Sequence, residues 1–170
     1  MKFARPALIA AVAAAVLAVA AMAAWRGTSA PEPAPAVSYT LLDGERGSLE
    51  ALRGKVVLVN FWATSCATCV AEMPAIAATH GRFKSRGFET LAVAMRHDAP
   101  ASVAHFAQSR QLPFGVAIDN TGDIARRFGD VQLTPTLFLI DKLGRIVKRY
   151  VGTPDFAALH VLVEELLAQT

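Results

Sequence analysis

The stretch Val56–Trp62 constrains the fold of this chain most, because six of its seven residues are apolar. A strand that is apolar on both faces is typical of a parallel strand in a sheet that helices cover on both sides. We therefore predict a central strand over Lys55–Phe61. The chain then runs into Cys66-Ala67-Thr68-Cys69, at the start of a predicted helix over residues 66–84 that Pro74 is expected to bend. This order of strand, CxxC and helix indicates an α/β fold.

The two cysteines of this motif are the only ones in the chain. The start of a helix directs unpaired N–H groups and a partial positive charge at the first sulfur, which favours the thiolate. Cys66 is therefore the candidate nucleophile. Cys69, one helical turn later, is placed to resolve a mixed disulfide. The motif predicts a pair that cycles between dithiol and disulfide.

Two other interpretations of the CxxC are less favoured. A structural zinc ion usually takes four ligands, but the chain has no second cysteine pair, and its four histidines do not follow HxxxH or HxxH spacing. A purely structural disulfide between residues three apart removes little entropy from the unfolded chain. We therefore expect redox chemistry, with no bound metal and no soluble cofactor.

The N-terminal segment predicts export. Lys2 and Arg5 precede an unbroken apolar stretch over Ala7–Ala24, which as a helix spans about 27 Å, slightly less than the ~30 Å hydrocarbon core. The basic residues place the start of the chain in the cytoplasm and the rest outside. Residues 1–26 are thus a signal anchor, or a signal peptide cleaved near Ala21-Met22-Ala23. We expect a periplasmic protein, tethered to the inner membrane or, after cleavage, soluble.

Charge and composition define the rest of the chain. From Gly27 onward, fourteen Lys and Arg balance fourteen Asp and Glu, so the basic pI does not indicate nucleic-acid binding. Residues 27–36 are rich in Pro and Ala and predict an extended linker. Residues 37–170 have the size of one domain.

Alternating elements fill this domain. We expect an α/β/α sandwich with a mixed sheet, closed by a hairpin around Asp141–Gly144 and a terminal helix. Asp98 is the expected N-cap of the helix over residues 100–110, and Thr153 is the expected N-cap of the terminal helix. Besides those already named, the predicted strands cover residues 38–41, 88–95, 116–118, 136–140 and 145–151, and the predicted helices residues 48–52, 100–110, 123–128 and the terminal segment from 153.

Two motifs carry a resemblance to a known family. The runs Val59–Pro74 and Leu133–Asp141 together resemble the TlpA/ResA branch of membrane-anchored thioredoxins. The resemblance implies a thioredoxin-like fold and an extracytoplasmic thiol–disulfide oxidoreductase, mostly a reductant, with some members serving cytochrome c maturation. We also expect a protein disulfide as substrate and a monomer. The electron donor should be a membrane thiol carrier, because the compartment is oxidising and lacks a glutathione buffer. Ser65 and Thr68 depart from the tryptophan and proline that many relatives carry beside the cysteines.

The resemblance assigns roles to further residues. Pro135 matches a cis-proline packed against the active-site disulfide, which leaves the backbone of Thr134 free to pair with a substrate peptide. Glu72, on the same side of the helix as Cys69, matches a buried acid that moves the proton of the resolving thiol. The alternative is an exposed glutamate that interacts only with the helix dipole. Trp62 is either a wall of the active site or a core residue.

Other functions fit the residues less well. A copper-handling module would bind Cu(I) through the same two thiolates, but its cysteines are usually further apart and joined by a histidine ligand. A peroxidase would need an arginine and threonine set around one cysteine, which the sequence does not place. We expect His97 in a solvated loop and His80, His105 and His160 on helix surfaces, none of them catalytic.

Overall fold

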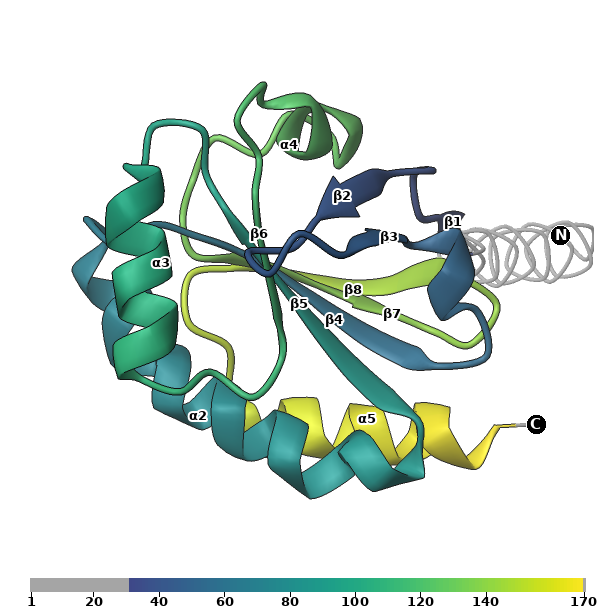
Figure 1. Cartoon of the computed structure of the whole chain (residues 1–170). Coiled ribbons are helices and arrows are strands. Elements are labelled where there is room, and N and C mark those ends of the chain that lie inside the picture. Colours follow the sequence, from purple (N-terminus) through teal and green to yellow (C-terminus); the bar gives the residue numbers. More distant parts are fainter. Residues whose placement is uncertain (1–30, 170) are drawn as a thin grey trace, which may run out of the picture. The chain divides into compact units, whose positions relative to one another are not determined.

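The computed structural model of the chain describes residues 31–169 (Figure 1). The predicted leader and the first residues of the predicted linker lie outside these residues. From Glu32 onward the chain forms one compact unit. Within residues 31–169 no helix combines the length and the apolar character needed to cross a bilayer.

A mixed six-stranded sheet forms the centre of this unit. The sequence predicted a mixed sheet, but the predicted strand at residues 38–41 pairs in a separate two-stranded sheet. The central strand β4 pairs in parallel with β5 and antiparallel with β7, and β5 pairs in parallel with β6. The antiparallel neighbours β8 and β1 extend the sheet on the β7 side. The order is β1 (Glu32–Pro33), β8 (Arg145–Val151), β7 (Thr136–Ile140), β4 (Val56–Trp62), β5 (Phe88–Ala94) and β6 (Gly115–Ile118).

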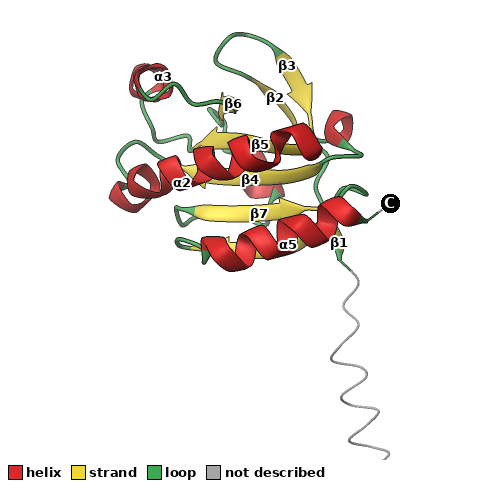
Figure 2. Ribbon diagram, turned by 90° about the horizontal axis from the view of Figure 1, so that it is seen from below, coloured by secondary structure: helices red, strands yellow, loops and turns green. Residues whose placement is uncertain are grey.

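Helices cover one face of the sheet. Figure 2 shows α2 (Ala67–Phe83) lying along β4 and β5, and α5 (Phe156–Ala168) along β7. These helices and α3 (Pro100–Ser109) pack on one apolar cluster with Val56, Leu58 and Trp62 of β4. α2 runs through Pro74 and is followed by the 3-10 turn η2 (Lys84–Arg86).

The other face carries shorter elements. Val57, Val59 and Phe61 point into a second apolar cluster, because side chains alternate along β4. This cluster is closed by α4 (Asp123–Arg127), the hairpin of β2 (Ser38–Thr40) and β3 (Arg46–Ser48), and the 3-10 turn η1 (Glu50–Leu52). All seven residues of β4 are buried, which is why the sequence of this strand is apolar on both faces.

The sheet begins inside the segment that the sequence analysis assigned to the linker. Glu32 and Pro33 pair with Ile146 and Arg145 at the edge of the sheet, and the Ala34 N–H donates to Gly144 O at 2.9 Å. An edge strand tolerates a proline because its missing N–H faces away from the sheet. Such a short strand carries no alternation of apolar residues, so the sequence offers no signal for it.

Three side chains differ from their predicted places. The N-cap of α5 is Asp155, whose carboxylate accepts from the N–H groups of Ala157 and Ala158, and not Thr153. The N-cap of α3 is Ala99, without a side-chain bond, because the carboxylate of Asp98 binds elsewhere. His80 was predicted on a helix surface but is buried between α2 and the sheet, and its Nδ1 lies 3.2 Å from Thr90 Oγ1 on β5.

Candidate active site

The cysteine pair lies at the start of α2, as predicted. Cys66 is the N-cap residue, and its sulfur accepts from the Cys69 N–H at 3.2 Å. The two cysteines form a disulfide with 5.2 Å between their Cα atoms. Cys66 is partly exposed, whereas Cys69 has no exposed surface. A substrate therefore reaches the sulfur of Cys66 first, and Cys69 can act only from behind it.

A buried carboxylate stabilises the turn that connects β4 to Cys66. The Cys66 N–H donates to Ala63 O at 3.1 Å, which closes a tight turn after β4. Inside this turn, both the N–H and the hydroxyl of Thr64 donate to the carboxylate of Asp98, each at 2.5 Å. Asp98 is only 7 % exposed. Sequence reasoning missed this contact, although Asp98 follows β5 at the same sheet edge where the CxxC follows β4.

The Thr134–Pro135 peptide bond is cis, which confirms the prediction for Pro135. The Thr134 carbonyl oxygen lies 3.6 Å from Cys66 Sγ, and Thr134 itself is half-buried. Two hydrogen bonds hold this loop: Thr136 Oγ1 donates to Leu133 O, and the Gly152 N–H donates to Pro135 O. The backbone that was expected to receive a substrate peptide thus lies directly beside the nucleophilic sulfur.

Glu72 is buried, with 5 % of its surface exposed, which confirms burial over the exposed alternative. It follows Cys69 by three residues on the same helix, and neither carboxylate oxygen has a hydrogen-bond partner within residues 31–169. Burial raises the pKa of Glu72 above its ordinary value. The hydroxyl of Thr153 acts in the opposite direction and lowers this pKa, although the contact falls short of hydrogen-bond geometry.

Trp62 lies behind the site and not on its surface. Its side chain has no exposed area and packs on the ring of Phe106 from α3, with 5.1 Å between ring centres. Trp62 is therefore a core residue and not a wall of the active site, because a buried indole cannot contact a substrate. Asn60, two residues earlier on β4, is also completely buried, and its amide atoms have no hydrogen-bond partner among the described residues.

No histidine is hydrogen-bonded to either cysteine within residues 31–169. His105 is exposed on α3, His97 is exposed in the loop after β5, and burial lowers the pKa of His80. Within residues 31–169 no three His, Cys, Asp or Glu side chains are grouped as metal ligands. The cysteine-and-histidine set that a copper module uses is therefore not assembled in this part of the chain.

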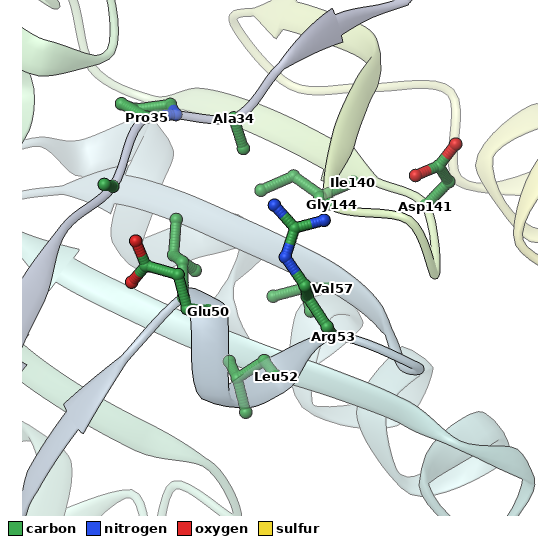
Figure 3. A pocket seen from close by; sticks show the side chains of 11 residues that line it. Ala34, Pro35, Glu50, Leu52, Arg53, Val57, Ile140, Asp141 and Gly144 are labelled. Carbon is green, nitrogen blue, oxygen red and sulfur yellow. The ribbon is translucent and has the colours of Figure 1, made fainter.

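One hollow lies far from the cysteines along the sheet. It has a volume of about 100 Å³. Its lining includes Leu52 at the end of η1 and Arg53 after it, Val57 at the start of β4, and Asp141 and Gly144 of the β7–β8 hairpin (Figure 3). The Arg53 guanidinium donates to Leu143 O and so binds this hairpin. None of the predicted site residues lines it.

Comparison with known proteins gives consistent matches. Residues 29–160 match the family model named Redoxin. The thiol–disulfide oxidoreductase ResA of Bacillus subtilis strain 168 is 35% identical over 134 residues, which cover 78% of this chain and 74% of the relative. ResA of Bacillus cereus strain ATCC 10987 is 36% identical over 119 residues, covering 70% and 68%.

Solved structures are similar over most of the chain. The solution structure of a putative thioredoxin from Neisseria meningitidis has a TM-score of 0.76 and 40% identity, and covers 82% of this chain and 93% of the other. A putative thiol:disulfide interchange protein DsbE from Chlorobium tepidum has a TM-score of 0.73 and 30% identity, with coverage of 81% and 97%. This chain therefore shares its α/β architecture with these two proteins.

Proposed function

The chain belongs to the redoxin family and is a thiol–disulfide oxidoreductase of the ResA and DsbE type, and from this we propose that it reduces protein disulfides outside the cytoplasm. The observation that carries the proposal is the unequal placement of the two sulfurs. Cys66 is accessible at a helix start beside the cis-proline loop, and Cys69 is buried behind it. A helix start favours the thiolate at Cys66.

The reaction is two successive exchanges. The Cys66 thiolate attacks one sulfur of the substrate disulfide, which forms a mixed disulfide and releases the other substrate sulfur as a thiolate. The Cys69 thiol then loses its proton, and its thiolate attacks Cys66 Sγ and releases the second substrate thiolate. Glu72 takes the proton of Cys69 in this step. Two electrons pass to the substrate, and the pair ends as the Cys66–Cys69 disulfide.

Regeneration requires a dithiol donor. The positive residues before the apolar leader favour export of the domain to a compartment that is kept oxidising and has no glutathione buffer. Two electrons must therefore return to the pair from a membrane thiol carrier, by the same exchange in the opposite direction. The substrate is a polypeptide, because the Thr134 backbone beside Cys66 offers main-chain pairing to an extended strand.

Insulin reduction tests the proposal. Wild-type protein with a chemical dithiol as donor should precipitate the insulin B chain, and Cys66→Ser should be inactive. Cys69→Ser should accumulate a mixed disulfide with the substrate, because the resolving thiol is absent. Circular dichroism of both variants provides the control for folding. Full activity of a folded Cys66→Ser protein would refute the mechanism.

A further inference from the structure

A hollow of about 270 Å³ lies beside the cis-proline loop. Its lining comes from helix α4 and from three segments at the sheet edge that carries the cysteines: the loop after β5, the loop from β6 into α4, and the segment before the cis-proline. The Met95 N–H, at the start of the first loop, donates to Trp62 O, four residues before Cys66. The hollow therefore borders the redox site.

A bound substrate strand can reach this hollow. Gln132 lines it and stands two residues before Thr134, whose carbonyl oxygen lies 3.6 Å from Cys66 Sγ. Two extended residues span at most about 7 Å. We consider a substrate strand that pairs with the Thr134 backbone while its cysteine reacts with Cys66. The side chain of a substrate residue that lies about two to four positions from this cysteine in the substrate sequence then reaches the hollow.

Arg96 supplies the one cation of this hollow that has no partner within residues 31–169. No hydrogen bond or ion pair involves its guanidinium among these residues, and the residue is exposed. Its stem lies close to Gly122. A Cβ on Gly122 would lie 3.1 Å from Arg96 Cδ, so the absence of a side chain at Gly122 lets the arginine lie across the start of α4.

The loop under Arg96 is also fixed. The Asp98 N–H donates to Met95 O at 2.9 Å, and the Asp98 carboxylate binds Thr64 of the turn before Cys66. The backbone that carries Arg96 is therefore fixed relative to the turn before Cys66, while the guanidinium stays free to meet an incoming group.

The acids of the hollow are already bound to other groups. Asp119 is 2 % exposed, and its carboxylate accepts from the N–H groups of Ile124 and Ala125. Asp130 accepts from Gln132 Nε2 at 2.8 Å. The other arginine of the lining, Arg126, is paired with Asp123. A carboxylate arriving from outside would find its free donor in Arg96, whose planar guanidinium matches a carboxylate in a bidentate pair.

We propose that Arg96 binds an aspartate or glutamate of the substrate polypeptide, two to four residues from the reacting cysteine, and so directs the enzyme toward acidic cysteine-bearing segments. This inference rests on the proposed function, because it requires a substrate strand at Thr134. The pairing adds no chemical step. It raises the rate at which acidic substrates form the mixed disulfide, as exposed complementary charges mainly change association.

Synthetic peptides test this directly. Each carries one cysteine as a mixed disulfide with thionitrobenzoate, whose coloured release follows the attack of reduced full-length protein. Two matched pairs place Asp or Asn three residues before or after the cysteine. For one pair, at about 10 mM salt, we expect the Asp peptide to react about fivefold faster than the Asn peptide. In about 1 M salt the preference should disappear.

Arg96→Gln should abolish this preference and leave the rate of the Asn peptide unchanged. Arg86→Gln is the matched control, because Arg86 is an exposed arginine just before β5, at the opposite end of the strand from Arg96. It should retain the preference. Equal rates for Asp and Asn peptides in wild type, or a preference that persists in Arg96→Gln, would overturn the inference while the reductase function stands. A wild-type protein that reacts with neither peptide would refute the proposed function, and this inference with it.

Discussion

Glu72 is a buried carboxyl one helical turn from Cys69, and burial raises its pKa. An acid with a raised pKa holds its proton more tightly in the folded state than in the unfolded state. Its contribution to stability is therefore most favourable at low pH. It is lost as the pH rises from the ordinary value of 4.5 through the raised value.

Replacement of Glu72 by glutamine should remove this pH dependence. Relative to wild type, the free energy of unfolding of the oxidised Glu72→Gln protein should rise with pH above about 4.5, by about 1.4 kcal/mol for each unit by which the pKa is raised. Urea unfolding at a series of pH values measures it. Glu165→Gln, which removes an exposed carboxylate from α5, should show no such trend. A pH-independent difference between Glu72→Gln and wild type would show that Glu72 ionises normally.

The same variant should lose activity without unfolding. Without a proton acceptor beside Cys69, resolution of the mixed disulfide should slow by a factor on the order of ten to a hundred. Alkylation rates of the reduced protein against pH should show Cys66 still as the more acidic thiol, because the start of α2 acts on it directly. Unchanged turnover together with superimposable alkylation curves would exclude Glu72 from the mechanism.

Local spacing placed the two cysteines and Glu72, whereas the resemblance to a known family pointed to Pro135 and to the role of Glu72. Cys66 and Cys69 lie one turn apart at a helix start, and Glu72 follows at the next turn, so helical geometry alone places them on one side. Trp62 was ambiguous, because an aromatic residue at the end of a strand fits a core as well as a binding surface. Arg96 was not found, because the sequence does not show that Gly122, 26 residues later, makes room for its side chain.

At the level of elements, the predicted strands and helices match the observed bounds to within about two residues, but β1 and β3 were not predicted and the predicted caps of α3 and α5 were wrong. Alternation and apolar runs mark strands locally, so β7 and β8 begin and end where the sequence places them. A cap is different, because a polar residue near a helix start can bind the helix or another segment. Asp155 and not Thr153 caps α5, and Thr153 faces the carboxyl of Glu72. The carboxylate of Asp98 accepts from Thr64 and does not cap α3.

The contact between Asp98 and Thr64 joins the two loops that border the redox site, and its removal should destabilise the protein. Asp98→Ala removes two hydrogen bonds to a charged acceptor and should lower the free energy of unfolding by about 2–3 kcal/mol. Thr64→Val removes only the hydroxyl bond and should cost about 1.5 kcal/mol. Thr64→Ser keeps both donors and provides the control. Urea unfolding of the oxidised proteins gives the three values. Equal stability of Thr64→Val and Thr64→Ser would show that the hydroxyl bond contributes nothing.

For the whole molecule, the topology brings the functional loops to one sheet edge. β4, β5 and β6 are parallel, so the loops that follow them emerge together, and antiparallel β7 begins at the same edge, directly after the cis-proline. The CxxC turn, the Arg96 loop and the Thr134 backbone are therefore neighbours although they lie far apart in sequence. The sequence predicted a mixed sheet but not which loops meet at this edge. The hollow beside it depends on side-chain packing and could be found only in the structure.

The direction of electron flow depends on the compartment in which the domain meets its donor, which we propose lies outside the cytoplasm. If the protein is a reductase, its reduction potential should lie well below the ~−120 mV of a strong periplasmic oxidant. The Cys66–Cys69 pair should then be largely reduced in cells that have the membrane thiol donor, and oxidised in cells that lack it. Rapid acid quenching followed by alkylation with a mass-tagged thiol reagent separates the two forms on a gel. Wild-type protein that is fully reduced before alkylation carries two tags and marks the position of the open pair. A pair that is oxidised in both backgrounds would contradict the reductase assignment, because a reductant must receive electrons before it can pass them to a substrate.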